Sequence, residues 1–163
     1  MTVRAFLPTS LEQMPGEIPI FPLTGALLLP VGHLPLNIFE PRYLTMISDA
    51  LQTPQRLIGM TQTTDMAVSM GEAPLHTLGC AGRISAFSEN DDGTMLITLT
   101  GIIRFAIKEE LPLAAGGYRR VVPDFGDFAA DLSELSDAAG NEDVLRASVI
   151  DATKRYFEAK GFN

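Results

Sequence analysis

The stretch that decides the fold is PLNIFEPRY, residues Pro35–Tyr43, which holds two prolines, one acid, one base and four large apolar residues. Its first half predicts an extended segment. Its second half predicts the start of a helix, because proline is favoured at the first helical position, where its missing N–H costs nothing. The negative charge of Glu40 suits a helix N-terminus as well. The stretch is therefore a predicted strand-to-helix junction.

We interpret this junction as a structural motif and not as a catalytic one. Its members are Pro35, Asn37, Phe39, Glu40, Pro41 and Arg42. Pro35 and the apolar residues after it, Leu36, Ile38 and Phe39, are expected to hold the extended segment against the core. Arg42 is expected to reach back to Glu40 or to a backbone carbonyl. A buried arginine–carboxylate pair would make the motif intolerant to change, because removing one partner leaves a buried charge.

The helix that follows is predicted over Glu40–Thr53. Leu44, Ile47 and Leu51 are spaced to form one apolar stripe, and Pro54 ends the helix.

Strands are predicted on both sides of this helix, over residues 18–23, 26–30, 31–39, 56–63, 78–89, 94–110 and 116–125. Pro19 and Pro22 predict that the first strand is an edge or is irregular, because proline cannot donate to a ladder. Pro123 likewise places the end of the last strand at an edge. The sequence NDDG, residues 90–93, is a strong hairpin signal. Gly101 predicts a bulge or bend where a barrel curves.

Composition and charge narrow the class of protein. The 163 residues suit one domain with an appended element. The net charge of −8 argues against general nucleic-acid binding, which needs clustered lysine and arginine. No apolar run is long enough to span a membrane, and no signal peptide is evident, so a cytoplasmic protein is expected. Seven acids and no base lie between Asp124 and Asp143, as in a solvated linker or, alternatively, a docking site for a basic partner.

The predicted organisation has four parts. Residues 1–17 form a loose arm, residues 18–125 a β domain, residues 126–140 an acidic linker and residues 141–163 a C-terminal helix that begins a helical subdomain. The helix has an apolar face of Leu145, Val149, Ala152 and Tyr156, which must pack against something.

Several kinds of catalytic site are excluded or disfavoured. There is no Gly-Lys pair for a phosphate-binding loop and no G-x-S-x-G elbow. Lys108 lies beside two glutamates, which should keep it charged and make it a poor base. His76 and Cys80 lack the further ligands that zinc needs, so no metal and no cofactor are expected. Cys80 is expected to be a small buried hydrophobic residue.

A methionine-containing segment, Met66–Leu75, is the candidate binding loop. Met66, Val68, Met70 and Leu75 are its candidate polypeptide-binding residues, because methionine is common on adaptable binding surfaces. Met60 is expected to belong to the core. Arg119 and Arg120 are adjacent, so on a strand they point to opposite faces. A nucleic-acid site would need help from Arg83, Arg104 or Lys108.

An ordered set of motifs carries a family resemblance. IPIFPL, LLLP and PLNIFEPRY with its helix are followed by LIGM, LGCAGRI, ITLTGIIRF and YRRVVPDF. Together, over residues 18–125, these resemble the N-terminal domain of the Lon ATP-dependent protease family. Each motif alone is weak, but the ordered set is specific.

The resemblance implies a mainly β fold with some α: a PUA-like pseudo-barrel of mostly antiparallel strands with one embedded helix. It also implies a stand-alone bacterial Lon-domain protein without the ATPase and peptidase of full Lon. The implied function is non-catalytic recognition of unfolded or exposed apolar polypeptide segments. The implied partners include a protease or chaperone that such an adaptor would serve, and no membrane. The alternatives are an RNA-binding PUA-like module and an ATP-independent hydrolase.

Overall fold

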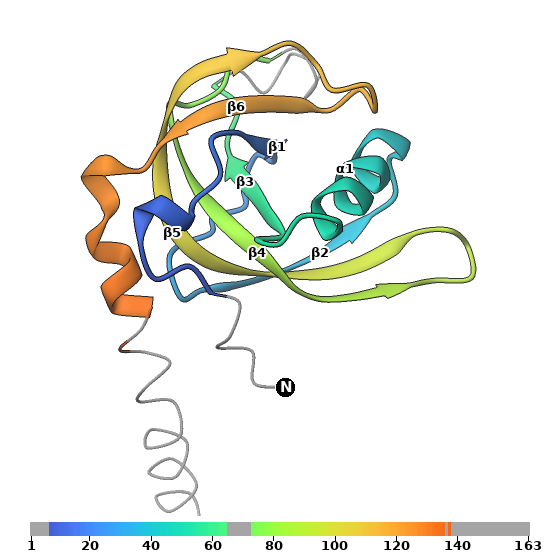
Figure 1. The fold of residues 1–163 in the computed structure, drawn as a ribbon. Coiled ribbons are helices and arrows are strands. Elements are labelled where there is room, and N and C mark those ends of the chain that lie inside the picture. Colours follow the sequence, from blue (N-terminus) through green and yellow to red (C-terminus); the bar gives the residue numbers. More distant parts are fainter. Residues whose placement is uncertain (1–6, 65–72, 136, 138–163) are drawn as a thin grey trace, which may run out of the picture.

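The computed structural model describes residues 7–64, 73–135 and 137, which fold around a strongly curved sheet (Figure 1). Its strands are β1 (Ile18–Pro22), β2 (His33–Ile38), β3 (Leu57–Thr61), β4 (Leu78–Glu89), β5 (Met95–Leu111) and β6 (Arg119–Asp124). Their order is β2-β5-β4-β3-β1-β6, and β6 also pairs with β5. This last pairing closes a ring of five strands, to which β2 is added. The predicted pseudo-barrel is confirmed.

The long strand β5 closes the ring because it has different neighbours along its length. It pairs with β2 through residues 95–100 and with β6 through residues 106–111. Between these parts, Ala81 pairs with Ile103 and Gly82 with Gly101, so Ile102 is an extra residue on β5. This bulge confirms the bend predicted from Gly101, since an extra residue sharpens the local curvature of a strand.

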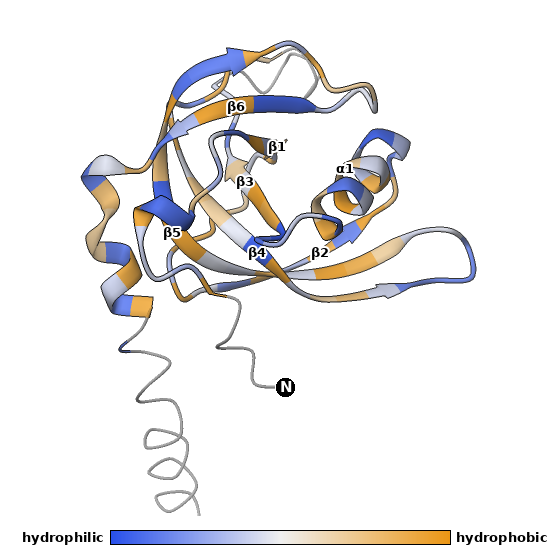
Figure 2. Ribbon diagram, viewed as in Figure 1, coloured by the Kyte–Doolittle hydropathy of each residue, from blue (hydrophilic) through white to orange (hydrophobic). Residues whose placement is uncertain are grey.

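The helix α1 (Pro41–Leu51) covers one end of the barrel interior. Pro41 is at the start of the helix and Glu40 is the N-cap residue, as predicted. The buried face consists of Tyr43, Met46, Ile47 and Ala50, whereas Leu44 and Leu51 are only partly buried. The predicted stripe is therefore rotated about the helix axis. Figure 2 shows apolar residues along the strands and along one side of α1, where they form the core.

The junction motif differs in part from expectation. Along β2, Leu36 and Ile38 point inward, whereas Pro35 and Asn37 are exposed. Phe39 is 66% exposed, so it does not hold the segment against the core. The reason is the period of two along a strand, which places alternate residues on the outer face.

The expected ion pair of this motif forms. The Nε of Arg42 donates to Oε2 of Glu40 at 3.0 Å. The two side chains are 29% and 32% exposed, so the pair is only partly buried, contrary to the expectation of a buried pair. Because both groups stay partly hydrated, the pair contributes only modestly to stability.

Of the two alternatives predicted for strand β1, an edge or an irregular strand, the edge is wrong. The strand lies between β3 and β6, and only Ile20 takes part in both pairings. Pro19 faces β6 alone and Pro22 faces β3 alone, which is how a strand with two prolines occupies an interior position. Pro123 lies beyond the residues of β6 that pair with β1. It pairs only with β5, as expected of an edge position.

Two segments predicted to be loose pack against the β domain instead. In the N-terminal arm, the 3₁₀ helix η2 (Leu11–Gln13) lies between Leu7 and Met14, which pack on the core. After β6, the 3₁₀ helix η3 (Gly126–Phe128) and helical residues 130–135 cover the same cluster.

The expected solvated linker is thus wrong for residues 126–135, where Leu132 and Leu135 are buried. The predicted C-terminal helix, residues 141–163, lies outside the described residues. Within the described part of the chain, no helix is both long enough and apolar enough to cross a membrane.

Candidate functional site

The candidate site begins where β3 and β4 separate. Their ladder ends at the pair Met60–Cys80. Pairing resumes with the hydrogen bond from the N–H of His76 to the carbonyl of Gln62, at 2.8 Å. Thr61 alone therefore faces three residues, 77–79, on the other strand. This wide bulge opens the sheet, and bulges of this kind are frequent beside functional sites.

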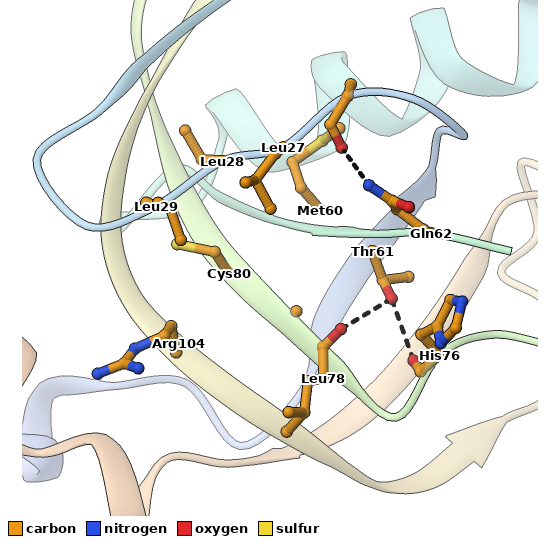
Figure 3. Close-up of a pocket in the computed structure, with 12 residues that line it drawn as sticks. Leu27, Leu28, Leu29, Met60, Thr61, Gln62, His76, Leu78, Cys80 and Arg104 are labelled. Carbon is orange, nitrogen blue, oxygen red and sulfur yellow. Dashed lines mark hydrogen bonds between the residues drawn. The ribbon is translucent and has the colours of Figure 1, made fainter.

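The side chain of Thr61 bridges the opening. Its hydroxyl lies 3.1 Å from the carbonyl oxygens of both His76 and Leu78 (Figure 3). The hydroxyl takes the place of the backbone donors that the bulge has moved away. The bulge also turns the side chain of Leu78 outward, where it is 59% exposed.

A segment from Thr24 to Gly32, which we call the leucine strap, crosses this opening. Its first end is fixed to the residues that follow β3. The side-chain amide of Gln62 donates to the carbonyl of Ala26 at 3.1 Å, and the hydroxyls of Thr24 and Thr63 are 2.8 Å apart. The strap replaces the strand that we predicted over residues 26–30.

The second end of the strap is fixed to the bulge in β5. The N–H of Val31 donates to the carbonyl of Gly101 at 2.9 Å, and the N–H of Gly101 donates to the carbonyl of Gly32 at 2.8 Å. A side chain at Gly101 would collide with the carbonyl of Leu29, so glycine is required there. Val31 has φ of 68°, a conformation that β-branched residues avoid, and these contacts hold it there.

Between its two ends the strap points its leucines alternately out and in. Leu27 is 70% exposed, Leu28 is 4% exposed and Leu29 is 52% exposed. This alternation is that of an extended chain. Two leucines are thus held in solvent by a backbone that is fixed at both ends.

The strap and the separated strands enclose a cleft of about 380 Å³, within the range of about 300–1,000 Å³ usual for ligand sites. Figure 3 shows the strap leucines on one side and Leu78 on the other. The described lining residues are mostly apolar: Ala26, Leu27, Leu28, Leu29, Met60, Thr61, Gln62, His76, Leu78, Gly79, Cys80 and Arg104.

Met60 and Cys80 belong to the hydrophobic core that underlies the cleft, which confirms the predictions for both. Burial raises the pKa of the Cys80 thiol to about 12. The thiol is therefore protonated at neutral pH and acts as apolar surface, since the thiolate is the reactive form.

Arg104 forms one wall of the cleft and joins it to the C-terminal segment. Its Nε donates to Oδ2 of Asp131 at 2.9 Å and its Nη2 donates to Oδ1 at 2.6 Å. Its backbone N–H also donates to Oδ2, at 3.0 Å. Asp131 is 1% exposed, and these hydrogen bonds from Arg104 hold the pKa of its carboxyl below the ordinary value. In Figure 3 the guanidinium points away from the strap leucines.

The site differs from the loop proposed from the sequence. Leu75 is partly buried, packs on the core and pairs with Thr63. Met66, Val68 and Met70 lie outside the described residues. The strap leucines were missed because a run of three leucines predicts a buried strand. Gly25 and Gly32 on either side of ALLLPV, residues 26–31, are the signal that could have indicated an exposed segment.

The arginines that a nucleic-acid site would need have protein partners. Arg119 is buried, and its Nε and Nη2 donate to the carboxylate of Glu110 at 2.7 and 2.9 Å. Arg83 is also buried and donates to the carbonyl of Gln55 at 2.8 Å. Arg120 points to the opposite face from Arg119, as predicted. These contacts occupy the guanidinium groups of Arg83 and Arg119 within the fold.

The fold and the cleft define a class: a β-barrel domain with a mostly apolar cleft beside a segment whose backbone is anchored at both ends. A family model described as ATP-dependent protease La (LON) substrate-binding domain matches residues 17–161. The chain belongs to this family, which confirms the resemblance drawn from PLNIFEPRY and the strand motifs.

Curated relatives are much longer than this chain. Lon protease 2 of Myxococcus xanthus is 29% identical over 98 residues, which are 60% of this chain and 12% of that protein. Lon protease of Flavobacterium johnsoniae is 25% identical over 145 residues, which are 88% of this chain and 16% of that protein. The chain therefore corresponds to a small part of each.

Solved structures support the same fold. The Lon N-terminal domain protein from Xanthomonas campestris has a TM-score of 0.53 and 26% identity, covering 67% of this chain and 59% of that one. The N-terminal domain of the Lon protease of the Mycobacterium avium complex has a TM-score of 0.56 and 15% identity, covering 85% and 75%. At this low identity the second likeness supports the fold alone.

Proposed function

We propose that this chain is a non-catalytic module that binds exposed apolar segments of polypeptides through the leucine strap and the cleft beneath it. The single observation that carries the proposal is the exposure of Leu27 and Leu29 on a strap fixed at both ends, with Leu78 of β4 exposed across the cleft from them. Apolar side chains gathered around a cleft in this way mark interaction sites.

The energetics suit a weak, reversible interaction. Covering three leucines that are 52–70% exposed releases about 1–2 kcal/mol each. The apolar side chains of the bound segment add a similar amount. Association entropy costs about 4–15 kcal/mol and offsets most of this gain, so a weak affinity is expected, no tighter than micromolar, about −8 kcal/mol. Such an affinity suits a domain that samples many clients.

The family's description supports an adaptor role. The matched family is named for substrate binding, and the relatives are named Lon proteases. We therefore propose that the domain presents clients to a protease or chaperone and does not cleave them itself.

The test is an NMR titration of the isotope-labelled protein with an unfolded, cysteine-blocked polypeptide and no ATP. Leu27→Ser is expected to weaken binding about fivefold to tenfold, because it removes about 1–1.4 kcal/mol of apolar contact. Leu113→Ser is the matched control, since Leu113 is also 59% exposed but does not line the cleft. Absence of chemical-shift changes at high ligand concentration, or equal effects of both variants, would reject the proposal.

The same samples test the alternatives. Mass spectrometry of the polypeptide after the titration detects any cleavage, which would indicate a hydrolase. A parallel titration with single-stranded RNA detects nucleic-acid binding. Shifts at Met66, Val68 and Met70 would extend the binding surface to the segment first proposed from the sequence.

A further inference from the structure

The leucine strap exposes main-chain hydrogen-bonding groups as well as leucines. Among the residues that the structure describes, the N–H and C=O of Leu27 and the N–H of Leu29 have no hydrogen-bond partner. The carbonyl of Leu29 accepts from the N–H of Gly32 at 3.0 Å. The N–H and C=O of Leu28 also have no partner in the described part of the chain, so residues 27–29 hold five unpaired backbone groups, of which three belong to Leu27 and Leu29.

The three groups of Leu27 and Leu29 are expected to share one edge of the strap. In an extended chain the N–H and C=O of one residue point to one edge, and those of the next residue point to the opposite edge. Leu27 and Leu29 are two residues apart, so their groups share an edge, and the alternating exposure of residues 27–29 supports the extended form. Leu27 and Leu29, which carry these groups, line the apolar cleft.

The outer edge of β2 is different. Pro35 lies at its centre and has no N–H to donate, and proline on an edge strand prevents the addition of another strand. No proline interrupts residues 26–29, so the strap edge is open to a partner strand.

We propose that a bound client pairs with the leucine strap as an added β-strand, with every second side chain in the cleft or over Leu78. This inference rests on the proposed function and names its substrate class: extended polypeptide with apolar residues at alternate positions. Main-chain hydrogen bonds provide affinity that does not depend on the sequence of the client, and the cleft selects apolar side chains.

A small apolar ligand fits this site less well. It would fill the cleft but leave the three backbone groups of Leu27 and Leu29 without partners once water is excluded, which is costly. A polypeptide satisfies the groups and the cleft together.

The test uses a ten-residue peptide with alternating leucines and a series in which one backbone nitrogen at a time is methylated. Methylation removes a donor and leaves the side chain unchanged. We expect a loss of about tenfold in affinity at the one position whose N–H donates to the carbonyl of Leu27 and little change at the other positions, since the lost hydrogen bond to the strap reduces binding. Equal tolerance at all positions would overturn strand addition and leave the proposed function intact. No binding of the parent peptide would overturn both.

Amide hydrogen exchange gives a second, independent readout. The Leu27 and Leu29 amides are expected to exchange fast in the free protein and to be protected when the peptide is bound, whereas the Leu113 amide is the control and stays unchanged. Protection of Leu27 and Leu29 in the free protein would show that the edge is already paired, and would overturn the inference. Sedimentation at several protein concentrations would then show whether a second copy is the partner.

Discussion

Leu27 and Leu28 are neighbours in the strap with opposite environments, so alanine at each position separates binding from stability. Leu28 is buried and covers Gly82, where an added Cβ would meet Leu28 Cδ2 at 2.6 Å. Replacing a buried leucine with alanine costs about 2–5 kcal/mol, and a loop can partly close the cavity. We therefore expect Leu28→Ala to lower the free energy of unfolding by about 2–3 kcal/mol. For a domain of this size, that is about 5–10 °C in melting temperature.

Leu27→Ala is expected to change the free energy of unfolding by less than about 0.5 kcal/mol, because the side chain is already mostly in water. The same variant should lose affinity for the apolar peptide. Urea titration followed by far-UV circular dichroism measures stability, since the chain has no tryptophan and only three tyrosines. If Leu27→Ala destabilises the protein as much as Leu28→Ala does, the strap does not have the described orientation.

Three further substitutions test the contacts around the site. Thr61→Val is nearly isosteric and is expected to lower the free energy of unfolding by about 1–2 kcal/mol in urea titrations, because the carbonyls of His76 and Leu78 lose the one O–H that they share. No loss would mean that water replaces the hydroxyl. Arg42→Ala should lower the free energy of unfolding by less than about 1 kcal/mol, since the Arg42–Glu40 pair is partly exposed. A larger destabilisation, seen as a larger fall in melting temperature, would support a buried pair instead. Asp131→Asn should destabilise the protein at neutral pH. The lowered pKa of Asp131 means that its contribution is complete above the ordinary value of 3.8 and is lost as the pH falls further. Urea titrations from pH 7 to pH 3 should therefore show the difference between wild type and variant shrinking only at the acid end, and a constant difference would contradict this.

The sequence was sufficient where a local signal decides the structure. The NDDG turn forms, with Gly93 at φ of 81° and a hydrogen bond from its N–H to the carbonyl of Asn90. Pro41 begins α1, and Arg42 pairs with Glu40. Each of these outcomes depends on residues within a few positions of one another, so periodicity and turn chemistry can predict them.

The sequence did not predict the features that depend on contacts between residues far apart in the chain. The strap is not a strand because its ends are held by Gln62 and Gly101, which are 36 and about 70 positions away. Residues 126–135 are not a solvated linker because Arg104 supplies a cationic partner for buried Asp131. Charge pattern alone predicts solvation, and only the fold brings the compensating arginine near.

The wide bulge at residues 77–79 and the bulge at Ile102 meet at the candidate site. The first moves Leu78 outward and creates the cleft, and the second brings Gly101 under the strap. Without the first, β3 and β4 would remain paired and the cleft would close. Without the second, the strap would have no anchor on β5. Because the strap is fixed before a ligand arrives, little of the binding free energy is lost in ordering its backbone. Disrupting the anchor by Gly101→Val should therefore impair peptide binding even if the barrel still folds.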